Sequence, residues 1–276
     1  LRAAAELPDT IGSEDGECVE CGFMKRYAEL LRNMIIEGVD SESDRLHPLR
    51  SMKIAVDAGN GVGGFYAYDV LAPLGADISG SVYLEPDGNF PNHAPNPENA
   101  EAMDCLSKAV VSSHSDLGVI FDTDVDRAAC VGKDGFEINR NRLVALASEI
   151  ALEGCPGGTI VTDSVTSDGL AAFIAAKGGK HLRFKRGYRN VINKQLELCA
   201  EGVKCPLAME TSGHAAFAEN YFLDDGAYLI TKLIIKAAAL AERGLALESL
   251  IDGLAEPAEE RELRFKILCD DFRPVG

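Results

Sequence analysis

The sequence predicts an α/β protein made of two similar units, each with a mostly parallel, mixed sheet. Short apolar runs of strand length alternate with longer segments whose apolar residues recur every three or four positions, as in strands alternating with helices. Some short runs, such as residues 117–121, are apolar or small throughout, as expected for strands buried on both faces of a parallel sheet. Polar loops follow these runs, at the sheet edge where such folds bind ligands.

Length and composition bound the class of protein. With 276 residues, 46% of them hydrophobic and 26% charged, the chain is long enough for about two globular domains. No apolar run approaches the roughly 18 residues of a membrane span, and residues 1–9 lack the parts of a signal peptide. The formal net charge of −17 argues against nucleic acids and acidic membranes as partners, because both would be repelled.

The eight cysteines are scattered along the chain, which suits free thiols in a reducing compartment. We therefore expect a cytoplasmic location, or a plastid if the source is a plant or alga. Cys18 and Cys21 form a lone C-x-x-C without a second pair, so neither zinc binding nor redox chemistry is expected there.

The first unit is expected to begin with a helix. Residues 1–22 are polar, acidic and aperiodic and are interpreted as a linker. Apolar residues at three- and four-residue spacing predict a helix over residues 23–36, ended by Gly38. A strand at 52–56 then leads into a glycine-rich turn at 57–64 and a helix at 65–74, and a second strand ends at Glu85.

Residues 85–98 cannot be regular structure, because they hold four prolines and three asparagines. Long loops of this kind inside a compact domain are usually functional. A helix at 100–113 and the strand at 117–121 follow. The order strand, helix, strand, helix, strand, with strands near Met52, Val82 and Leu117, predicts a parallel sheet.

The glycine-rich turn allows two interpretations. Gly59, Gly61 and Gly64 match G-x-G-x-x-G, and Glu85 stands about twenty residues further on, as in dinucleotide-binding folds. The alternative is a tight strand-to-helix turn in which the glycines permit close packing. Nothing downstream supplies a hydride-transfer site, so the sequence favours packing over a dehydrogenase.

The strongest chemical signal directly follows the strand at 117–121. Asp122, Asp124 and Asp126 stand at alternate positions, and Arg127 closes the run. Three neighbouring carboxylates repel one another, and a hard cation such as Mg²⁺ neutralises them with oxygen ligands while leaving room for phosphate oxygens. The alternative for such a motif is a solvated acidic turn.

Two other kinds of acidic loop can be compared with this motif. An EF-hand is excluded, because Arg127 and Lys133 stand where that loop requires a glycine and a bidentate glutamate. A haloacid-dehalogenase-like phosphatase also begins with an apolar strand and Asp-x-Asp. In that alternative Asp122 would be a phosphoryl-accepting nucleophile and Asp124 an acid/base.

A second α/β unit is expected after the glycine-rich break at residues 154–158. Before this break, an apolar run at 128–131 leads to a helix at 140–152. After it, strands are predicted at 159–162, 181–184 and 206–209, and helices at 169–177, 191–200 and 227–241. The strand at 206–209 ends in Glu210-Thr-Ser-Gly-His214. The tail at 256–276 carries a short strand-like piece at 263–268.

Residues 177–189 are strongly basic in an otherwise acidic chain, which indicates an anion site. The alternative is an edge strand guarded by charge. The basic residues are Lys177, Lys180, Arg183, Lys185, Arg186 and Arg189.

Taken together, six segments resemble the motifs of the α-D-phosphohexomutase family, which includes phosphoglucomutases and phosphomannomutases. They are residues 56–64 (VDAGNGVGG), 90–98 (FPNHAPNPE), 122–127 (DTDVDR), 185–190 (KRGYRN), 210–214 (ETSGH) and 223–226 (LDDG). They occur in family order across most of the chain, and the metal and E-x-S-G-H loops are the most specific. The resemblance interprets the glycine run as packing and the aspartates as ligands rather than nucleophiles.

Enzymes of this family have four domains around one cleft, and the resemblance implies that this chain carries the second and third. Residues 23–136 would be the metal-binding domain and residues 137–258 the sugar-binding domain. Residues 1–22 and 259–276 would be linkers to the first and fourth domains of the same polypeptide, which would be its partners.

The resemblance also implies a reaction. These enzymes interconvert hexose 1-phosphate and hexose 6-phosphate through a phosphoserine that gives its phosphate to the substrate. A hexose 1,6-bisphosphate turns over in the cleft and serves as activator. The implied metal ligands for Mg²⁺ are Asp122, Asp124 and Asp126, and the implied catalytic residues are Arg127, which would steady the phosphoryl group, and Lys185. The implied substrate-binding residues are Glu210, Ser212, His214, Lys185 and Arg186, with Glu210 and Ser212 on sugar hydroxyls.

The chain departs from the family pattern in several places. Thr123 and Val125 stand where the metal loop usually has Gly or Ala, and we expect little effect because their side chains do not ligate. Tyr188 replaces a histidine of bacterial phosphomannomutases, so it receives no acid/base role. The phosphoserine loop Thr-x-Ser-His-Asn-Pro and the last domain's phosphate-clamping loop do not occur in these 276 residues, so we expect the isolated chain to be inactive.

Two questions stay open at this level. The motifs do not distinguish glucose, mannose and glucosamine phosphates. A non-catalytic sugar-phosphate-binding module is a third class of function for the same motifs.

Overall fold

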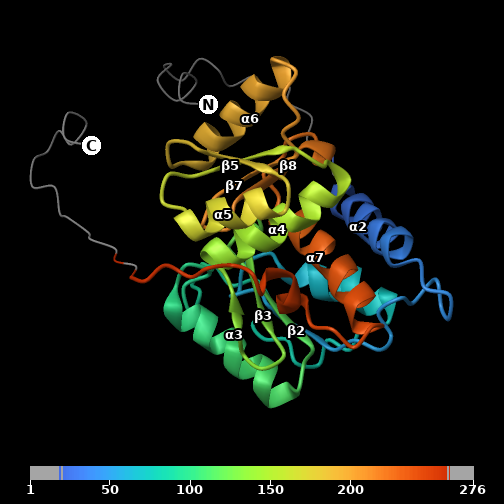
Figure 1. Ribbon diagram of the computed structural model, residues 1–276. Helices are drawn as coiled ribbons and strands as arrows, with labels where there is room; N and C mark the ends of the chain where they lie inside the picture. The colour runs from blue at the N-terminus through green and yellow to red at the C-terminus, as the bar shows by residue number, and fades with distance from the viewer. Residues whose placement is uncertain (1–18, 20, 260, 262–276) are drawn as a thin grey trace, which may run out of the picture.

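The computed structural model describes residues 19, 21–259 and 261, and folds them into two mixed four-stranded sheets with helices around them (Figure 1). This confirms the predicted α/β class with two mixed sheets. The predicted linker at 1–22 lies almost entirely outside the described residues, and the strand-like piece at 263–268 lies wholly outside them.

The first sheet has the order β1-β2-β3-β4. Its strands are β1 (Ile54–Asp57), β2 (Leu117–Phe121), β3 (Ala128–Gly132) and β4 (Glu137–Ile138). β1 and β2 are parallel, whereas β3 runs antiparallel to both of its neighbours, β2 and β4. Helix α3 (Ala100–Ser113) contacts β1, β2 and β3.

The strand predicted near Val82 is reduced to isolated parallel bridges, which join Asp77 to Lys53 and Val82 to Asp57. The segment therefore still lies beside β1 as an irregular edge, but the prediction of a regular strand ending at Glu85 was wrong. The local sequence explains this, because the Asp77 side chain accepts a hydrogen bond from the Ser79 backbone N–H and so favours a turn over a ladder.

Two predicted helices differ in detail from the observed ones. Helix α2 (Phe23–Val39) continues through Gly38, so Gly38 does not end it. A Cβ on Gly38 would lie 2.8 Å from Ile235, which shows that this glycine allows close packing against a later helix. The helix predicted at 65–74 is a π-helix, η1 (Tyr66–Leu71), followed by a 3₁₀ turn, η2 (Ala72–Leu74), that contains Pro73.

The second sheet has the order β6-β5-β7-β8. Its strands are β5 (Thr159–Thr162), β6 (Lys180–Arg183), β7 (Leu207–Met209) and β8 (Ala215–Phe217). The helices of this half are α4 (Arg140–Gly154), α5 (Asp168–Ala176), α6 (Tyr188–Ala200) and α7 (Gly226–Ala241), and the short turns are η3 (Ala218–Asn220) and η4 (Leu247–Ile251). α6 contacts β5 and β7 on one side of the sheet, while α4 and α5 lie on the other (Figure 1).

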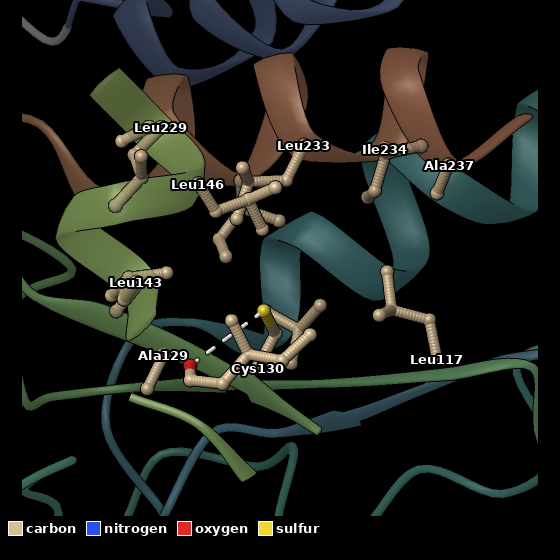
Figure 2. Packing of buried hydrophobic residues seen from close by; sticks show 14 of the residues in the cluster. Leu117, Ala129, Cys130, Leu143, Leu146, Leu229, Leu233, Ile234 and Ala237 are labelled. Atoms are coloured by element: carbon tan, nitrogen blue, oxygen red, sulfur yellow. Dashed lines mark hydrogen bonds between the residues drawn. The ribbon is translucent and has the colours of Figure 1, made fainter. Parts of the chain in front are cut away.

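Helix α7 belongs to the second half by sequence but also covers the first sheet. It contacts α2, α4, β2 and β3 as well as β8. Figure 2 shows Leu233 and Ile234 of α7 above Leu117 and Cys130 of the first sheet, with α4 beside them. Buried residues of both halves therefore form one large hydrophobic cluster.

Polar contacts reinforce the same junction. The Tyr27 hydroxyl of α2 lies 2.6 and 2.7 Å from the two carboxylate oxygens of Asp225, the N-cap residue of α7. The buried Tyr66 hydroxyl lies 2.8 Å from the Thr231 hydroxyl. Within the described part of the chain, no helix is long and apolar enough to cross a membrane.

Candidate functional site

The acidic loop stands at the carboxyl end of β2. Candidate ligand atoms of Asp122, Asp124 and Asp126 all lie within 4.8 Å of one another. Asp122 is buried, Asp126 is half-buried and Asp124 is exposed. The loop therefore directs three carboxylates from the end of a buried strand toward one point.

Arg127 holds the first of these carboxylates. Its Nε donates to Asp122 Oδ2 at 2.9 Å, and its backbone N–H donates to Asp122 Oδ1 at 3.1 Å. The same guanidinium donates through Nη1 to Asn96 Oδ1 at 3.1 Å. Because both oxygens of Asp122 accept hydrogen bonds from Arg127, this carboxylate is held in one orientation at the end of β2.

The electrostatics of the loop fit a cation. Burial and the neighbouring Asp122 carboxylate raise the pKa of Asp126 to about 7, although His214 opposes the shift. The raised pKa reflects burial and repulsion between neighbouring carboxylates, and a bound divalent cation would reduce this repulsion. Oxygen donors are also the ligands that Mg²⁺ prefers. The residues present therefore fit Mg²⁺.

The loop also carries backbone strain. Val125 is buried and has a φ of 70°, a left-handed conformation that a β-branched side chain rarely adopts. Its carbonyl accepts a hydrogen bond from Gly226 N–H at 3.0 Å, which ties the loop to the start of α7. The expectation that Val125 has little effect considered only metal ligation and not the strained backbone conformation of this residue.

The Glu210 loop stands at the carboxyl end of β7. Glu210 Oε1 accepts a 2.5 Å hydrogen bond from the Gly187 N–H, and the Ser212 hydroxyl donates to Glu210 Oε2 at 3.4 Å. Burial raises the pKa of Glu210, although the hydrogen bond from Gly187 opposes this. Glu210 is thus a buried acceptor group held against the basic segment 185–189.

The two loops meet directly. Arg127 and His214 form an isolated antiparallel bridge between them. His214 Nδ1 lies 2.8 Å from Asp224 Oδ2 and 3.7 Å from Asp126 Oδ2. Tyr188 stacks on the His214 ring, with ring centroids 4.9 Å apart. The structure therefore brings the predicted metal ligand Asp126 and the predicted substrate-binding residue His214 into one site.

The basic stretch divides into two parts. Lys177 pairs with Glu149 and Arg183 pairs with Asp168, and β6, which carries Arg183, is an edge strand. This part matches the interpretation of a charged edge. Lys185 and Arg186 instead lie exposed in the loop that leads to Gly187, with Lys185 Nζ 5.7 Å from the centre of the Phe184 ring.

A short turn at residues 96–98 contacts both Arg127 of the acidic loop and Arg186 of the basic segment. Asn96 accepts from Arg127, and Glu98 Oε1 lies 3.3 Å from Arg186 Nη2. The Asn139 side chain donates to the Pro97 carbonyl at 2.7 Å. The proline-rich loop thus positions one arginine of each half of the molecule.

Some residues of this site were not assigned roles from the sequence. Asp224 was quoted in the LDDG motif and Asn96 and Glu98 in the proline-rich motif, but nothing in their local pattern indicated their partners. Those partners come from other loops, so only a signal for long-range contact would have identified them. Asp225, from the same LDDG motif, is the N-cap residue of α7, and its side chain accepts a hydrogen bond from the Tyr228 N–H.

The glycine run packs closely, as its second interpretation requires. A Cβ on Gly64 would lie 2.1 Å from the Leu84 carbonyl oxygen, and one on Gly61 would lie 2.7 Å from that of Thr123. Such contacts leave no room for a side chain. The run therefore brings the backbone of neighbouring loops together behind the acidic loop.

Comparison with known proteins matches both halves of the chain. Residues 25–135 match the family model "Phosphoglucomutase/phosphomannomutase, alpha/beta/alpha domain II", and residues 139–257 match that of domain III. A phosphomannomutase/phosphoglucomutase of Pseudomonas aeruginosa is 36% identical over 235 residues, which cover 85% of this chain and 47% of that protein.

Solved structures give the same result. A phosphoglucomutase/phosphomannomutase family protein of Burkholderia thailandensis has a TM-score of 0.68 and 32% identity, covering 83% of this chain and 46% of that one. An N-acetylphosphoglucosamine mutase of Aspergillus fumigatus, solved with GlcNAc-6P and magnesium, shares the fold at a TM-score of 0.55 and 14% identity, covering 84% and 54%.

The chain thus spans about half the length of the curated relatives that it matches. The two family models cover its two halves in the order in which their sheets occur. With the paired acidic and Glu210 loops in place, this chain belongs to the phosphoglucomutase/phosphomannomutase family and contains its domains II and III.

Proposed function

We propose that this chain forms the metal- and sugar-binding part of a phosphohexomutase, which interconverts hexose 1-phosphate and hexose 6-phosphate. The observation that carries the proposal is the contact between the two strand-end loops, where the Arg127–His214 bridge joins an acidic loop to the Glu210 loop. One loop suits a cation and the other suits the hydroxyls of a sugar. A hexose phosphate needs both.

In this proposal Asp122, Asp124 and Asp126 hold Mg²⁺, which neutralises charge on the transferred phosphoryl group. Arg127 is already fixed by Asp122 and Asn96, so its guanidinium is preorganised to steady the same group. Phosphoryl transfer depends mainly on such positioning and charge neutralisation. The magnesium complex among the structural neighbours supports the choice of metal.

In this proposal the Glu210 carboxylate accepts hydrogen bonds from sugar hydroxyls and the Ser212 hydroxyl donates to or accepts from them, with His214 beside both. Lys185 and Arg186 supply positive charge for a phosphate group on the same side. The −17 net charge of the chain makes this local cationic segment necessary for an anionic substrate.

The transfer itself requires a phosphoserine and a hexose 1,6-bisphosphate, as the family resemblance implies. These 276 residues contain no Thr-x-Ser-His-Asn-Pro loop. We therefore expect a polypeptide of only these residues to bind Mg²⁺ or sugar phosphate weakly and to show no turnover, even with glucose 1,6-bisphosphate added.

A coupled mutase assay on this polypeptide tests the last point, with glucose, mannose and glucosamine 1-phosphates offered in turn. Turnover that disappears in Asp124→Asn would show that a nucleophile exists within these residues. A beryllofluoride adduct at Asp122 would instead favour the phosphatase alternative. Calorimetric titration with Mg²⁺ and with glucose 1-phosphate tests binding, and the loss of sugar-phosphate binding in Glu210→Gln is the expected result.

A further inference from the structure

A second group of metal-ligating side chains lies behind the glycine-rich turn, apart from the acidic loop. Asp57 ends β1, His93 comes from the proline-rich loop and Cys105 from the second turn of α3. Their candidate ligand atoms lie within 4.8 Å of one another. Asp57 is 0% and His93 7% exposed, and Cys105 is partly buried. A strand end, a loop and a helix thus converge on one largely buried point.

The hydrogen bonds around His93 require a positive charge at this point. His93 Nδ1 lies 3.0 Å from the Ala94 carbonyl oxygen, and Nε2 lies 2.9 Å from Asp57 Oδ2. Both partners are acceptors, whereas a neutral imidazole carries only one N–H. Either a second proton or a metal ion must lie between Nε2 and the buried carboxylate.

The arrangement at Nδ1 is the one that metal-binding histidines adopt. Such a histidine usually donates its other ring N–H to a carbonyl or carboxylate, which fixes the tautomer and the ring orientation. The Ala94 carbonyl supplies that acceptor, and a Tyr83 ring packs edge-on against His93 with centroids 5.4 Å apart. Asp57 is fixed as well, because its Oδ1 accepts from the Gly59 N–H at 2.8 Å.

Cys105 completes the donor set. Its Sγ lies 3.8 Å from the Tyr83 hydroxyl, so the thiol faces the same space as the His93 ring. One carboxylate oxygen, one imidazole nitrogen and one thiolate form a donor set that suits Zn²⁺, unlike the all-oxygen acidic loop.

We propose that Asp57, His93 and Cys105 bind Zn²⁺, with water as the fourth ligand. Bonds of about 2.0–2.3 Å at tetrahedral angles place ligand atoms about 3.3–3.6 Å apart. On binding, the distance between His93 Nε2 and Asp57 Oδ2 increases slightly from 2.9 Å, and the Cys105 Sγ moves toward these two atoms. The ion cross-links β1, the proline-rich loop and α3. It thereby fixes the loop that holds Arg127 and Arg186, and its role is structural.

Cobalt provides a spectroscopic test that is independent of enzyme activity. In a Cys18→Ser/Cys21→Ser background, which removes the lone C-x-x-C, Co²⁺ is expected to give an intense near-ultraviolet thiolate-to-metal absorption at one equivalent. Cys105→Ser should abolish this absorption, and Cys155→Ser, a matched change at another partly buried thiol, should leave it unchanged. Zn²⁺ should bleach the band by competition. No band, or a band that survives Cys105→Ser, would overturn the proposal.

A second measurement separates this site from the acidic loop. Zn²⁺ is expected to raise the melting temperature of the same background protein, and also of its Asp124→Asn variant, but not of its Cys105→Ser variant. Binding should also release protons, because Zn²⁺ displaces the proton of the Cys105 thiol and the second proton of the His93 imidazole. A Zn²⁺-dependent shift that disappears with Asp124→Asn and persists in Cys105→Ser would place the ion in the acidic loop and refute the site.

Discussion

The two halves of the molecule repeat one arrangement of strands with different chemistry at the strand ends. In each, a strand with a parallel partner on both sides (β1 or β5) lies beside a strand (β2 or β7) that also pairs with an antiparallel strand. Asp57 and Asp163 directly end or follow the first of these strands, and Asp122 and Glu210 follow the second. The comparison shows that topology sets where a polar side chain stands, whereas the neighbouring loops set what it can bind.

The aspartates at the first pair of positions illustrate the difference. Both oxygens of Asp57 have partners, in Gly59 and His93. Asp163 is equally buried, but only its Oδ2 accepts hydrogen bonds, from Thr211, and Oδ1 has no hydrogen-bond partner among the described residues. Burial raises the pKa of Asp163, against the opposing effect of Thr211. One half satisfies its buried carboxylate, and the other leaves it in part unsatisfied.

The largest expected effect comes from substituting Asp57, and Asp163 provides the comparison. In metal-free protein, Asp57→Asn should lower the free energy of unfolding by about 3 kcal/mol, because it leaves a buried His93 without its charged partner. Asp163→Asn should change it by about 1 kcal/mol or less, because an amide oxygen still accepts from Thr211 and an ill-solvated charge is removed. Urea unfolding of both variants measures this, and equal losses would contradict the comparison.

Two histidines should respond to pH with opposite signs. The hydrogen bond to Asp57 raises the pKa of His93, so its stabilisation is complete below its unfolded pKa near 6.5 and is lost as pH rises through the folded pKa. Burial, with Arg183 nearby, lowers the pKa of His181 to about 4. The native state then resists protonation, and stability falls as pH drops from 6.5 toward 4, by about 3 kcal/mol.

Unfolding of wild type, His93→Gln and His181→Gln in EDTA between pH 4 and pH 8 separates these contributions. Relative to wild type, the His181 variant should lose less stability on acidification. The His93 variant should be most destabilised at low pH. Identical pH profiles for the two variants would refute the assignment.

Metal affinity should distinguish the two strand-end loops. Asp124→Asn removes one of three clustered carboxylates and should weaken Mg²⁺ binding at least about tenfold, or about 1.4 kcal/mol. Glu210→Gln in the other loop should leave Mg²⁺ affinity nearly unchanged, because it lies outside the carboxylate cluster. Isothermal titration at constant ionic strength measures both, and equal weakening would show that the loops share the ion.

The smallest effects concern two exposed ion pairs, one that joins the halves and one within a helix. Glu98→Gln breaks the pair with Arg186 and should cost less than about 1 kcal/mol, because both side chains are partly exposed. Asp104→Asn breaks the exposed helical pair with Lys108 and should cost still less, because solvent screens both side chains. Denaturation in low and high salt checks the order, and a larger loss in Asp104→Asn would reverse it.

Local sequence was sufficient where a segment's neighbours did not decide its structure. The apolar run before Asp122 predicted β2, and the periodic spacing predicted helices such as α3, because these signals reside in consecutive residues. The prediction of a strand near Val82 was wrong because a turn, held by the hydrogen bond from the Ser79 N–H to the Asp77 side chain, competes with strand pairing beside β1. The prediction that Gly38 ends the helix was wrong because the reason for the glycine is its close contact with Ile235, a residue far away in the sequence.

The candidate site follows the same division. The acidic loop could be interpreted from spacing alone, since its three carboxylates lie within five residues. The roles that we propose for Glu210, Ser212 and His214 come from the family resemblance, since one carboxylate among neutral residues does not specify a ligand. Contacts such as that of Asp224 with His214, or of Asn96 with Arg127, depend on how separate loops of the same half meet.

The position of helix α7 has a consequence for how the chain folds during its synthesis. The apolar face of β2 and β3 is complete once Gly132 has left the ribosome, but the helix that covers it ends at Ala241. At ordinary synthesis rates this interval is on the order of ten seconds. During that time the second sheet is made while the first keeps an uncovered hydrophobic surface. The packing of the first half is therefore completed only after the second half has been synthesised.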